Sequence, residues 1–399
     1  MQTRQTAHSP RMLIVTGEAS GDLHGAHLVR AIKRRLPDAQ ISGVGGAHLK
    51  AEGVALLSSS DELAVVGVVE VLKKLGVVWS VFRKLTRFLK EERPDLVMLV
   101  DYPDFNLRLA RVAHKLGIPV VYYISPQVWA WRSSRVKLIQ RVVTKMIVIF
   151  PFEQEFYRRR GVDVEWIGHP LVESVRSSLT KAQFCERHGL APERPILGLL
   201  PGSRDSEVER LLPVMIAAAQ RIRQQQPETQ FILPVAPPLE QSALFADLPP
   251  WVISVRQQTY EAIRAADLVI TASGTVTVET AILETPMMIA YIVSPLTYWI
   301  GSKFINVRFI GMVNLIAGKE VAKEFIQQAA TPNAIAQEAL RLLNNPAALA
   351  DIRRELRLVH QKLGEPGATD RAAAVIEHVL QGRVSDEFLA PSRQAAKNA

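Results

Sequence analysis

Two short stretches in the second half of the sequence carry residues suited to binding a phosphate group. The Gly202–Arg204 loop follows an apolar run and leads into a helix expected to begin near Ser206. The Ser273–Thr275 turn also follows an apolar run and opens a helix. Backbone N–H groups and the helix dipole attract anions to a helix start, and the Arg204 guanidinium adds charge-assisted hydrogen bonds. Together the two helix starts predict a nucleotide site.

A glutamate follows the second of these helix starts by one turn. Glu279 lies four residues after Thr275, so both side chains share one helix face. A carboxylate there can accept hydrogen bonds from both ribose hydroxyls, although it could instead complement the helix dipole. Arg204 has a similar alternative, an ion pair with Asp205 or Glu207 inside the protein. The presence of two such helix starts favours the nucleotide.

The first half of the sequence offers carboxylates for acid–base chemistry. Asp101 and Asp104 follow the apolar run PDLVMLV. Asp101, at the tip of the predicted strand, is the expected general base, because a base must reach within about 3 Å of the proton it removes. Asp104 is expected to cap the next helix or to orient a partner. The earlier loop TGEASGDLHGA places Glu18, Ser20 and Gly21 after another strand, either as a ligand-lining loop or as a capped turn.

Two further segments carry polar residues in apolar or aromatic surroundings. The stretch SPQVWAWR contains Gln127 and Trp129, which would form a wall for an amphipathic ligand or stack on single-stranded nucleic acid. Asn314 stands among apolar residues in MVNLIAG. A buried amide needs hydrogen-bond partners, so Asn314 belongs either to a ligand site or to a core segment.

The elements that must position these residues alternate regularly. Short apolar strands alternate with helices as far as Thr331, which predicts βαβ units and parallel sheets covered on both faces. The alternation restarts after a strand-free stretch between Pro170 and Pro195. We therefore expect an α/β protein with two Rossmann-like parallel-sheet domains facing across a cleft, with ligands at the carboxyl ends of the strands. The expected domains cover 1–175 and 176–345; C-terminal helices over 346–381 could pack back on the first domain, and a flexible tail covers 382–399.

Composition limits the class of protein. The 399 residues carry a net charge of +9, with 48% apolar and 22% charged residues, as in folded proteins. The positive charge either indicates anionic partners, such as nucleic acid, an acidic membrane surface or phosphorylated substrates, or is only that of a soluble basic protein. The single cysteine, Cys185, excludes a disulfide framework within one chain and indicates a reducing compartment. We find no signal peptide, no Walker A sequence and no metal-ligand cluster. The very apolar stretch Leu63–Phe82 is interrupted by Glu70, Lys73 and Lys74, which favours a surface helix or a monotopic membrane contact over a spanning helix.

A series of motifs between residues 12 and 380 resembles the lipid-A-disaccharide synthase family. In order they are GEASGDLHGA, DYPDFN, SPQVWAWR, FPFE, IGHPL, LLPGSR, ASGTVTVET and NLIAGKEVAKEFIQ. The resemblance implies a two-domain GT-B fold with no cofactor and no metal requirement. It also implies an inverting hexosyltransferase that joins UDP-2,3-diacylglucosamine to 2,3-diacylglucosamine 1-phosphate, giving the β-1,6-linked lipid A disaccharide 1-phosphate and UDP.

The resemblance further implies roles for individual residues. It makes Asp101 the base on the acceptor hydroxyl and puts Arg204 near the UDP phosphates, so that both are catalytic. The residues expected to bind UDP are Arg204, Ser273, Gly274, Thr275, Glu279 and Asn314. Those expected on the acceptor side of the cleft are Glu18, Ser20, Gly21, Asp104, Gln127 and Trp129.

The resemblance places the protein in the cytoplasm, peripherally at the inner face of the inner membrane, in contact with anionic lipid and not with nucleic acid. It leaves open a homodimer, the acyl chain length and the extent of domain closure. One alternative is another UDP-sugar enzyme of the same fold, such as a UDP-N-acetylglucosamine epimerase or a muramyl-type transferase. The other is a non-catalytic nucleic-acid-binding protein that uses the basic surface and the Trp-rich loop.

Overall fold

The computed structural model describes residues 9–60, 68–129, 133–294, 298 and 308–382, with the backbone alone for residues 19, 68–75 and 133. Residues 63–67 of the apolar stretch and residues 383–399 of the predicted tail lie outside these ranges. The chain divides into two compact units. We call Met1–Pro170 with Gly367–Ala399 the first domain and Leu171–Pro366 the second domain.

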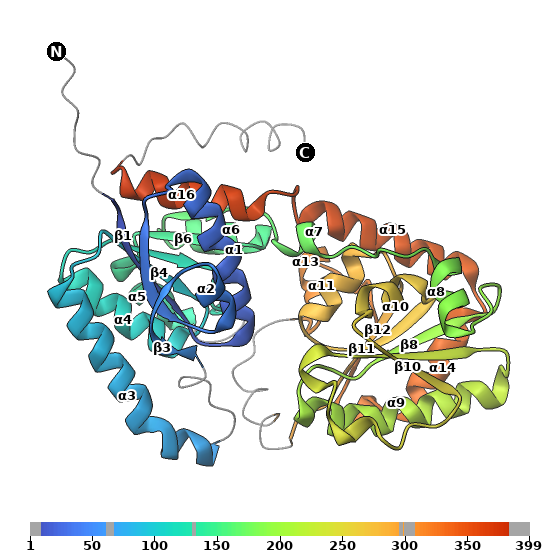
Figure 1. The fold of residues 1–399 in the computed structure, drawn as a ribbon. Helices are drawn as coiled ribbons and strands as arrows, with labels where there is room; N and C mark the ends of the chain where they lie inside the picture. Colours follow the sequence, from blue (N-terminus) through green and yellow to red (C-terminus); the bar gives the residue numbers. More distant parts are fainter. Residues whose placement is uncertain (1–8, 61–67, 130–132, 295–297, 299–307, 383–399) are drawn as a thin grey trace, which may run out of the picture. The chain divides into compact units, whose positions relative to one another are not determined.

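The first domain is built on a seven-stranded parallel sheet (Figure 1). The strand order is β3-β2-β1-β4-β5-β6-β7, so the direction of winding reverses between β1 and β4. Central strands such as β4 are buried along their whole length, as the continuous apolar runs predict. The strands are β1 (Arg11–Thr16), β2 (Gln40–Gly45), β3 (Ala55–Ser59), β4 (Leu96–Val100), β5 (Val120–Tyr123), β6 (Lys145–Val148) and β7 (Val164–Trp166).

Helices connect these strands, and one helix from the far end of the chain joins them. The connecting helices are α1 (Ala19–Arg35), α2 (Ala47–Ala51), α3 (Val68–Glu91), α4 (Pro103–Lys115), α5 (Val136–Val142) and α6 (Pro151–Arg158). The last helix, α16 (Ala368–Leu380), packs against α1. Ion pairs from Arg34 to Asp370 and from Arg35 to Glu377 join the two helices. The C-terminal segment is therefore part of the first domain.

The second domain repeats this plan with six parallel strands in the order β10-β9-β8-β11-β12-β13. The direction of winding reverses between β8 and β11. The strands are β8 (Ile196–Leu200), β9 (Gln230–Val235), β10 (Val252–Arg256), β11 (Leu268–Ala272), β12 (Met287–Tyr291) and β13 (Glu324–Ile326). The helices are α7 (Leu171–Ser174), α8 (Lys181–His188), α9 (Asp205–Gln225), α10 (Thr259–Ala265), α11 (Thr275–Ile282), α13 (Met312–Ala317), α14 (Pro332–Leu343) and α15 (Pro346–Lys362).

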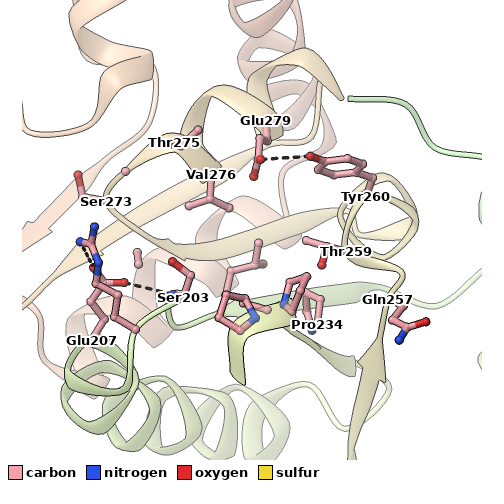
Figure 2. A pocket seen from close by; sticks show the side chains of 18 of the residues that line it. Ser203, Glu207, Pro234, Gln257, Thr259, Tyr260, Ser273, Thr275, Val276 and Glu279 are labelled. Carbon is pink, nitrogen blue, oxygen red and sulfur yellow. Dashed lines mark hydrogen bonds and ion pairs between the residues drawn. The ribbon is translucent and has the colours of Figure 1, made fainter. Parts of the chain in front are cut away.

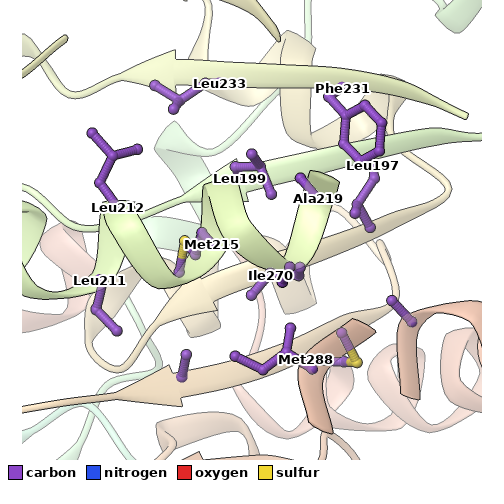
Figure 3. Close-up of a cluster of buried hydrophobic side chains, with 14 of the residues drawn as sticks. Leu197, Leu199, Leu211, Leu212, Met215, Ala219, Phe231, Leu233, Ile270 and Met288 are labelled. Carbon is purple, nitrogen blue, oxygen red and sulfur yellow. The ribbon is translucent and has the colours of Figure 1, made fainter. Parts of the chain in front are cut away.

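The core of the second domain explains why α9 forms where it does. Apolar residues recur along α9 at helical spacing and bury one face against the sheet (Figure 3). Truncating a buried Leu or Met of this kind to Ala costs about 2–5 kcal/mol of stability. The side chains in contact are Leu211, Leu212, Met215 and Ala219 from α9 and Leu197, Leu199, Phe231, Leu233, Ile270 and Met288 from the strands. This packing fixes the start of α9 at the end of β8.

Two edge strands were not predicted from the sequence. In β3 the first residue, Ala55, is exposed and the others are half-buried; β13 has only three residues. Both strands lack the buried apolar run that marks central strands.

The helices predicted over 346–381 belong to different domains. Helix α15 packs on α11 and α13 of the second domain, while α16 packs on α1 of the first domain. Within the described ranges, no helix has the length and apolar character needed to cross a bilayer.

Candidate functional site

A pocket of about 720 Å³ lies in the second domain where the strand order reverses (Figure 2). Its walls come from the segments that follow β8, β9, β10 and β11, at the carboxyl ends of the strands, where parallel α/β sheets bind ligands. Five of the residues expected to bind UDP line this pocket: Arg204, Ser273, Gly274, Thr275 and Glu279.

The Gly202–Arg204 loop is held by a carboxylate from the first turn of α9. Glu207 Oε2 accepts a hydrogen bond from the Ser203 backbone N–H over 3.2 Å, and Glu207 Oε1 lies 3.3 Å from Arg204 Nη1. Gly202 has φ of 124°, and a Cβ there would lie 2.6 Å from Glu207 Oε2 and 2.8 Å from the Glu207 Cβ. The Arg204 side chain is 67% exposed, and exposed ion pairs are weak. The guanidinium therefore remains available to an anion in the pocket.

The Ser273–Thr275 turn is fixed from two sides. The Ser273 hydroxyl donates to the Ile310 carbonyl oxygen over 3.1 Å, and the Thr277 hydroxyl donates to the Gly274 carbonyl oxygen over 2.8 Å. Gly274 has φ of 149°. The N–H groups in the first turn of a helix have no acceptor within the helix, and Thr275 and Val276 of this turn line the pocket. The turn can therefore bind an oxyanion through its backbone.

Glu279 points toward a tyrosine that the sequence reasoning missed. The Tyr260 hydroxyl donates to Glu279 Oε1 over 3.2 Å (Figure 2). Burial raises the pKa of Glu279, and the hydrogen bond from Tyr260 opposes that rise. Burial and the neighbouring Glu279 carboxylate also raise the pKa of Tyr260, so its hydroxyl stays a donor. One oxygen of the Glu279 carboxylate thus accepts a hydrogen bond from Tyr260. The carboxylate has further acceptor positions that could accept hydrogen bonds from a ribose.

Asn314 lies outside the lining of this pocket. Its side-chain amide donates to the Ala322 carbonyl oxygen (2.7 Å) and to Glu324 Oε1 (2.9 Å). Its Oδ1 accepts from the backbone N–H groups of Val321 (2.7 Å) and Ala322 (2.9 Å). All its ordinary hydrogen-bonding positions are taken. Because Glu324 also accepts from Ile310 N–H (2.9 Å), this network holds the segment to which Ser273 bonds.

In the first domain, Asp101 follows β4 beside the reversal in strand order. Its pKa is raised to about 6, chiefly by burial and next by the nearby Glu18 carboxylate, while a hydrogen bond from the Tyr102 backbone opposes the rise. Such a group is a carboxylate at neutral pH and a stronger base than an ordinary aspartate. Glu18 itself is exposed at the start of α1, as is Ser20, and Gly21 is buried.

The remaining residues expected on the acceptor side have different environments. Asp104 is the second residue of α4 and forms an ion pair with Arg135, so it does not cap that helix, whose N-cap is Tyr102. Gln127 is exposed. Trp129 is half-buried, and its Nε1–H donates to Glu153 Oε1 over 3.1 Å. Trp131 and Arg132 of the same stretch lie outside the described residues.

Glu153 is a buried carboxyl group that the sequence reasoning did not single out. It is 2% exposed and accepts hydrogen bonds from Trp129 and from the Phe150 backbone N–H. Burial raises its pKa to about 7, against the hydrogen bonds that favour its charged form. A glutamate three residues after the N-cap residue is the usual signal for such a cap, and the sequence FPFE contains it at Glu153.

The described part of the chain holds no group of three or more His, Cys, Asp or Glu side chains suited to a metal ion.

Structural comparison supports the fold. A UDP-N-acetylglucosamine 2-epimerase from Neisseria meningitidis, solved with UDP-GlcNAc, matches 93% of this chain and 100% of its own, with a TM-score of 0.64 and 11% identity. The MurG protein of Acinetobacter baumannii matches 93% of this chain and 99% of its own, with a TM-score of 0.56 and 18% identity. The two parallel-sheet α/β domains are therefore of the GT-B type, as predicted.

Sequence comparison is more specific. The family model described as Lipid-A-disaccharide synthetase matches residues 12–379. The lipid-A-disaccharide synthase of Syntrophus aciditrophicus is 47% identical over 372 residues, which cover 92% of this chain and 97% of that protein. Sequence identity at this level over nearly the whole chain shows the family, whereas the structural matches show only the fold. The chain belongs to the lipid-A-disaccharide synthase family of glycosyltransferases.

Proposed function

We propose that this chain transfers a 2,3-diacylglucosamine unit from its UDP derivative to 2,3-diacylglucosamine 1-phosphate. The products are the β-1,6-linked disaccharide 1-phosphate and UDP, and the configuration at the anomeric carbon is inverted. The proposal rests on the second-domain pocket, where Arg204, the Ser273–Thr275 turn and Glu279 converge, in a chain of this family.

The donor nucleotide is proposed to occupy that pocket. Its diphosphate lies at the two helix starts, near Arg204 and the Ser273–Thr275 turn, and its ribose hydroxyls donate to Glu279. Asn314 acts on this site indirectly, because its network with Glu324 holds the segment that accepts the Ser273 hydrogen bond. The Ser273–Thr275 turn is thus held in place before the nucleotide arrives.

The reaction itself needs a base for the acceptor and a place for the charge of the leaving group. Asp101 removes the proton from the attacking hydroxyl, which then attacks the anomeric carbon as UDP departs. The negative charge that develops on UDP is offset by Arg204 and by the N–H groups at the starts of α9 and α11. Preorganised groups of this kind stabilise a transition state because they need no reorientation as charge develops.

The acceptor is proposed to lie along the strand ends of the first domain. The glycine-rich loop at Glu18, Ser20 and Gly21 lines one side of this region. Gln127, with its exposed side chain, and the half-buried Trp129 provide a polar and an apolar surface for the acceptor sugar and its acyl chains. Asp104, paired with Arg135, orients that arginine near the same strand ends.

The helix α3 is proposed to touch the inner face of an anionic membrane, which would place the protein in the cytoplasm as a peripheral protein. Val77 is 41% exposed and Trp79 60% exposed, and Arg83 lies 4.5 Å from the Trp79 ring centroid. Each Lys or Arg near an anionic surface contributes about 1 kcal/mol. Replacing Val77, Val78 and Trp79 together by Ser should lower binding to anionic vesicles and raise the acceptor KM, whereas Leu358→Ser on the second domain should change neither. Unchanged values in the triple variant would end this proposal.

Mass spectrometry of the product tests the reaction. Incubation with UDP-diacylglucosamine and diacylglucosamine 1-phosphate should yield the disaccharide 1-phosphate, with equal rates in the presence and absence of EDTA. A free epimerised sugar nucleotide without a disaccharide would instead support the epimerase alternative. Loss of product in EDTA would contradict the metal-independent mechanism that the family resemblance implies.

A further inference from the structure

The backbone at the tip of β4 adopts a conformation that residues with a side chain avoid. Asp101 and Tyr102 both have φ of 47°. Left-handed conformations at two successive non-glycine residues are unfavourable and persist only where the surroundings hold them. The Tyr102 ring also fills the space beside Gly17, where a Cβ would overlap it. The groups that hold this backbone therefore set the direction of the Asp101 carboxylate.

Two buried side chains converge on the Asp101 carbonyl oxygen. Asn106 Nδ2 donates to it over 2.8 Å and to the Val100 carbonyl oxygen over 3.2 Å. The Tyr122 hydroxyl, from β5, donates to the Asp101 carbonyl oxygen as well. Both side chains are 0% exposed. A carbonyl oxygen has two lone pairs, so the two donors saturate it and fix the peptide group between Asp101 and Tyr102.

Asn106 occupies this place at a cost to the fold. Within the described residues its buried Oδ1 accepts no hydrogen bond, and an unsatisfied buried acceptor is unfavourable. The helix does not need the side chain, because the Asn106 backbone N–H already bonds to the Tyr102 carbonyl oxygen over 3.1 Å. An apolar residue of similar size would fill the same space without an unsatisfied oxygen. The Asn106 side chain therefore contributes its hydrogen bonds to the end of β4, at Val100 and Asp101.

We infer that Asn106 and Tyr122 are positioning residues for the Asp101 base. They hold its carbonyl group, and through it the strained backbone, so that the carboxylate is aimed before substrate binds. The inference rests on the proposed function, in which Asp101 removes the acceptor proton. Misplacement of a catalytic group by about 1 Å can lower the rate about 10²-fold. Loosening this backbone should therefore lower kcat.

The test uses Tyr122→Phe, which removes only the hydroxyl, and Asn106→Leu, which removes the amide at similar size. Each should lower kcat roughly 10- to 100-fold, by the cost of misplacement, with the donor KM and UDP affinity unchanged. In the Asp101→Asn background neither should lower the residual rate further, since residues that act through one group are not additive. If Asn106→Leu fails to fold, Tyr122→Phe alone carries the test.

The matched control is Thr285→Val in the second domain. It also removes a buried hydroxyl that donates to a backbone carbonyl, that of Ile263 at 2.9 Å, and should lower the melting temperature without lowering kcat. A near-normal kcat in Tyr122→Phe, or a loss that persists in full in the Asp101→Asn background, would overturn the positioning role while leaving Asp101 as the base. A near-normal rate in Asp101→Asn would overturn both.

Discussion

In the first domain the strand order reverses between β1 and β4, and the residues that follow these strands include Glu18 and Asp101. In the second domain it reverses between β8 and β11, and there the chain places Arg204 and the Ser273–Thr275 turn. Both reversals follow one topology, with parallel strands and helices that begin at the carboxyl ends. Because the topology is the same, it does not explain why the side chains at these two places differ.

The two places differ in the chemical groups that follow the strands there. Carboxylates crowd together in the first domain, and burial with the Glu18 charge raises the pKa of Asp101 to about 6, which suits a base. In the second domain the helix starts and Arg204 offer donors that suit an anion, while Glu207 and Glu279 of the same pocket accept hydrogen bonds from protein groups. We therefore propose that one topology supplies two ligand positions, of which the first moves a proton and the second binds a phosphate.

The largest expected effect comes from removing the base. Asp101→Asn should lower kcat by about 10² or more, the range for loss of a general base, measured by the rate of disaccharide formation. Asp163→Asn is the matched control, because Asp163 is a carboxylate of the same domain paired with Lys145 at 2.6 Å before β7. A wild-type rate in Asp101→Asn would remove acid–base chemistry from the first domain.

Removing Arg204, the cation that lines the second-domain pocket, should have the next largest effect. Arg204→Ala should weaken UDP binding roughly 10- to 100-fold, because hydrogen bonds to charged groups contribute about 1.5–3 kcal/mol. Calorimetric titration with UDP measures this, and Arg210→Ala, on the same helix with its guanidinium on the Ser206 carbonyl oxygen, should bind UDP normally. Equal affinity in the two variants would mean that Arg204 serves only its ion pair with Glu207.

A smaller effect is expected from the ribose contact. Glu279→Gln keeps the shape of the side chain but removes its charge, so UDP affinity should fall about 10-fold, within the range for one hydrogen bond to a charged group. With 2′-deoxy-UDP the loss should be smaller, because one of the two hydroxyls proposed to donate to Glu279 is absent. The same loss with both nucleotides would show that Glu279 supports the pocket without touching the ribose.

The smallest effect is a shift in pH dependence. The proposed base Asp101 must be a carboxylate to remove a proton, so kcat/KM should fall as pH drops below about 6, where the raised pKa of Asp101 makes it protonated. Glu18→Gln removes a negative charge that raises this pKa, so the acidic limb should move to lower pH. The ratio of activity at pH 5 to activity at pH 7.5 should therefore increase. An unchanged ratio would remove Glu18 from the electrostatics of the base.

The sequence was sufficient for the features that depend on local pattern. Continuous apolar runs identified the central strands, and the loop compositions at Arg204 and Ser273–Thr275 identified helix starts that the fold brings into one pocket. These features were accessible because a buried strand and a helix start each leave a signal within a few residues. The strand order then places their ends together.

Features that depend on contacts distant in sequence were not accessible. The hydrogen bond from Tyr260 to Glu279 joins the first turn of α10 to α11, 19 residues further along the chain. Asn314 was expected at the nucleotide, yet its four hydrogen bonds reach Val321 and Ala322, which precede β13, and Glu324, the first residue of β13. The left-handed backbone at Asp101 has no glycine to mark it. Each outcome depends on which partner the folded chain supplies, and a local pattern does not contain that information.

The division of labour between the two domains is tested most directly by calorimetric titration of UDP into the wild-type chain, Asp101→Asn, Arg204→Ala and the double variant. UDP should bind Asp101→Asn as tightly as the wild type, and should bind Arg204→Ala and the double variant equally and more weakly. A loss of UDP affinity in Asp101→Asn comparable to that in Arg204→Ala would contradict the assignment of the nucleotide to the second domain alone.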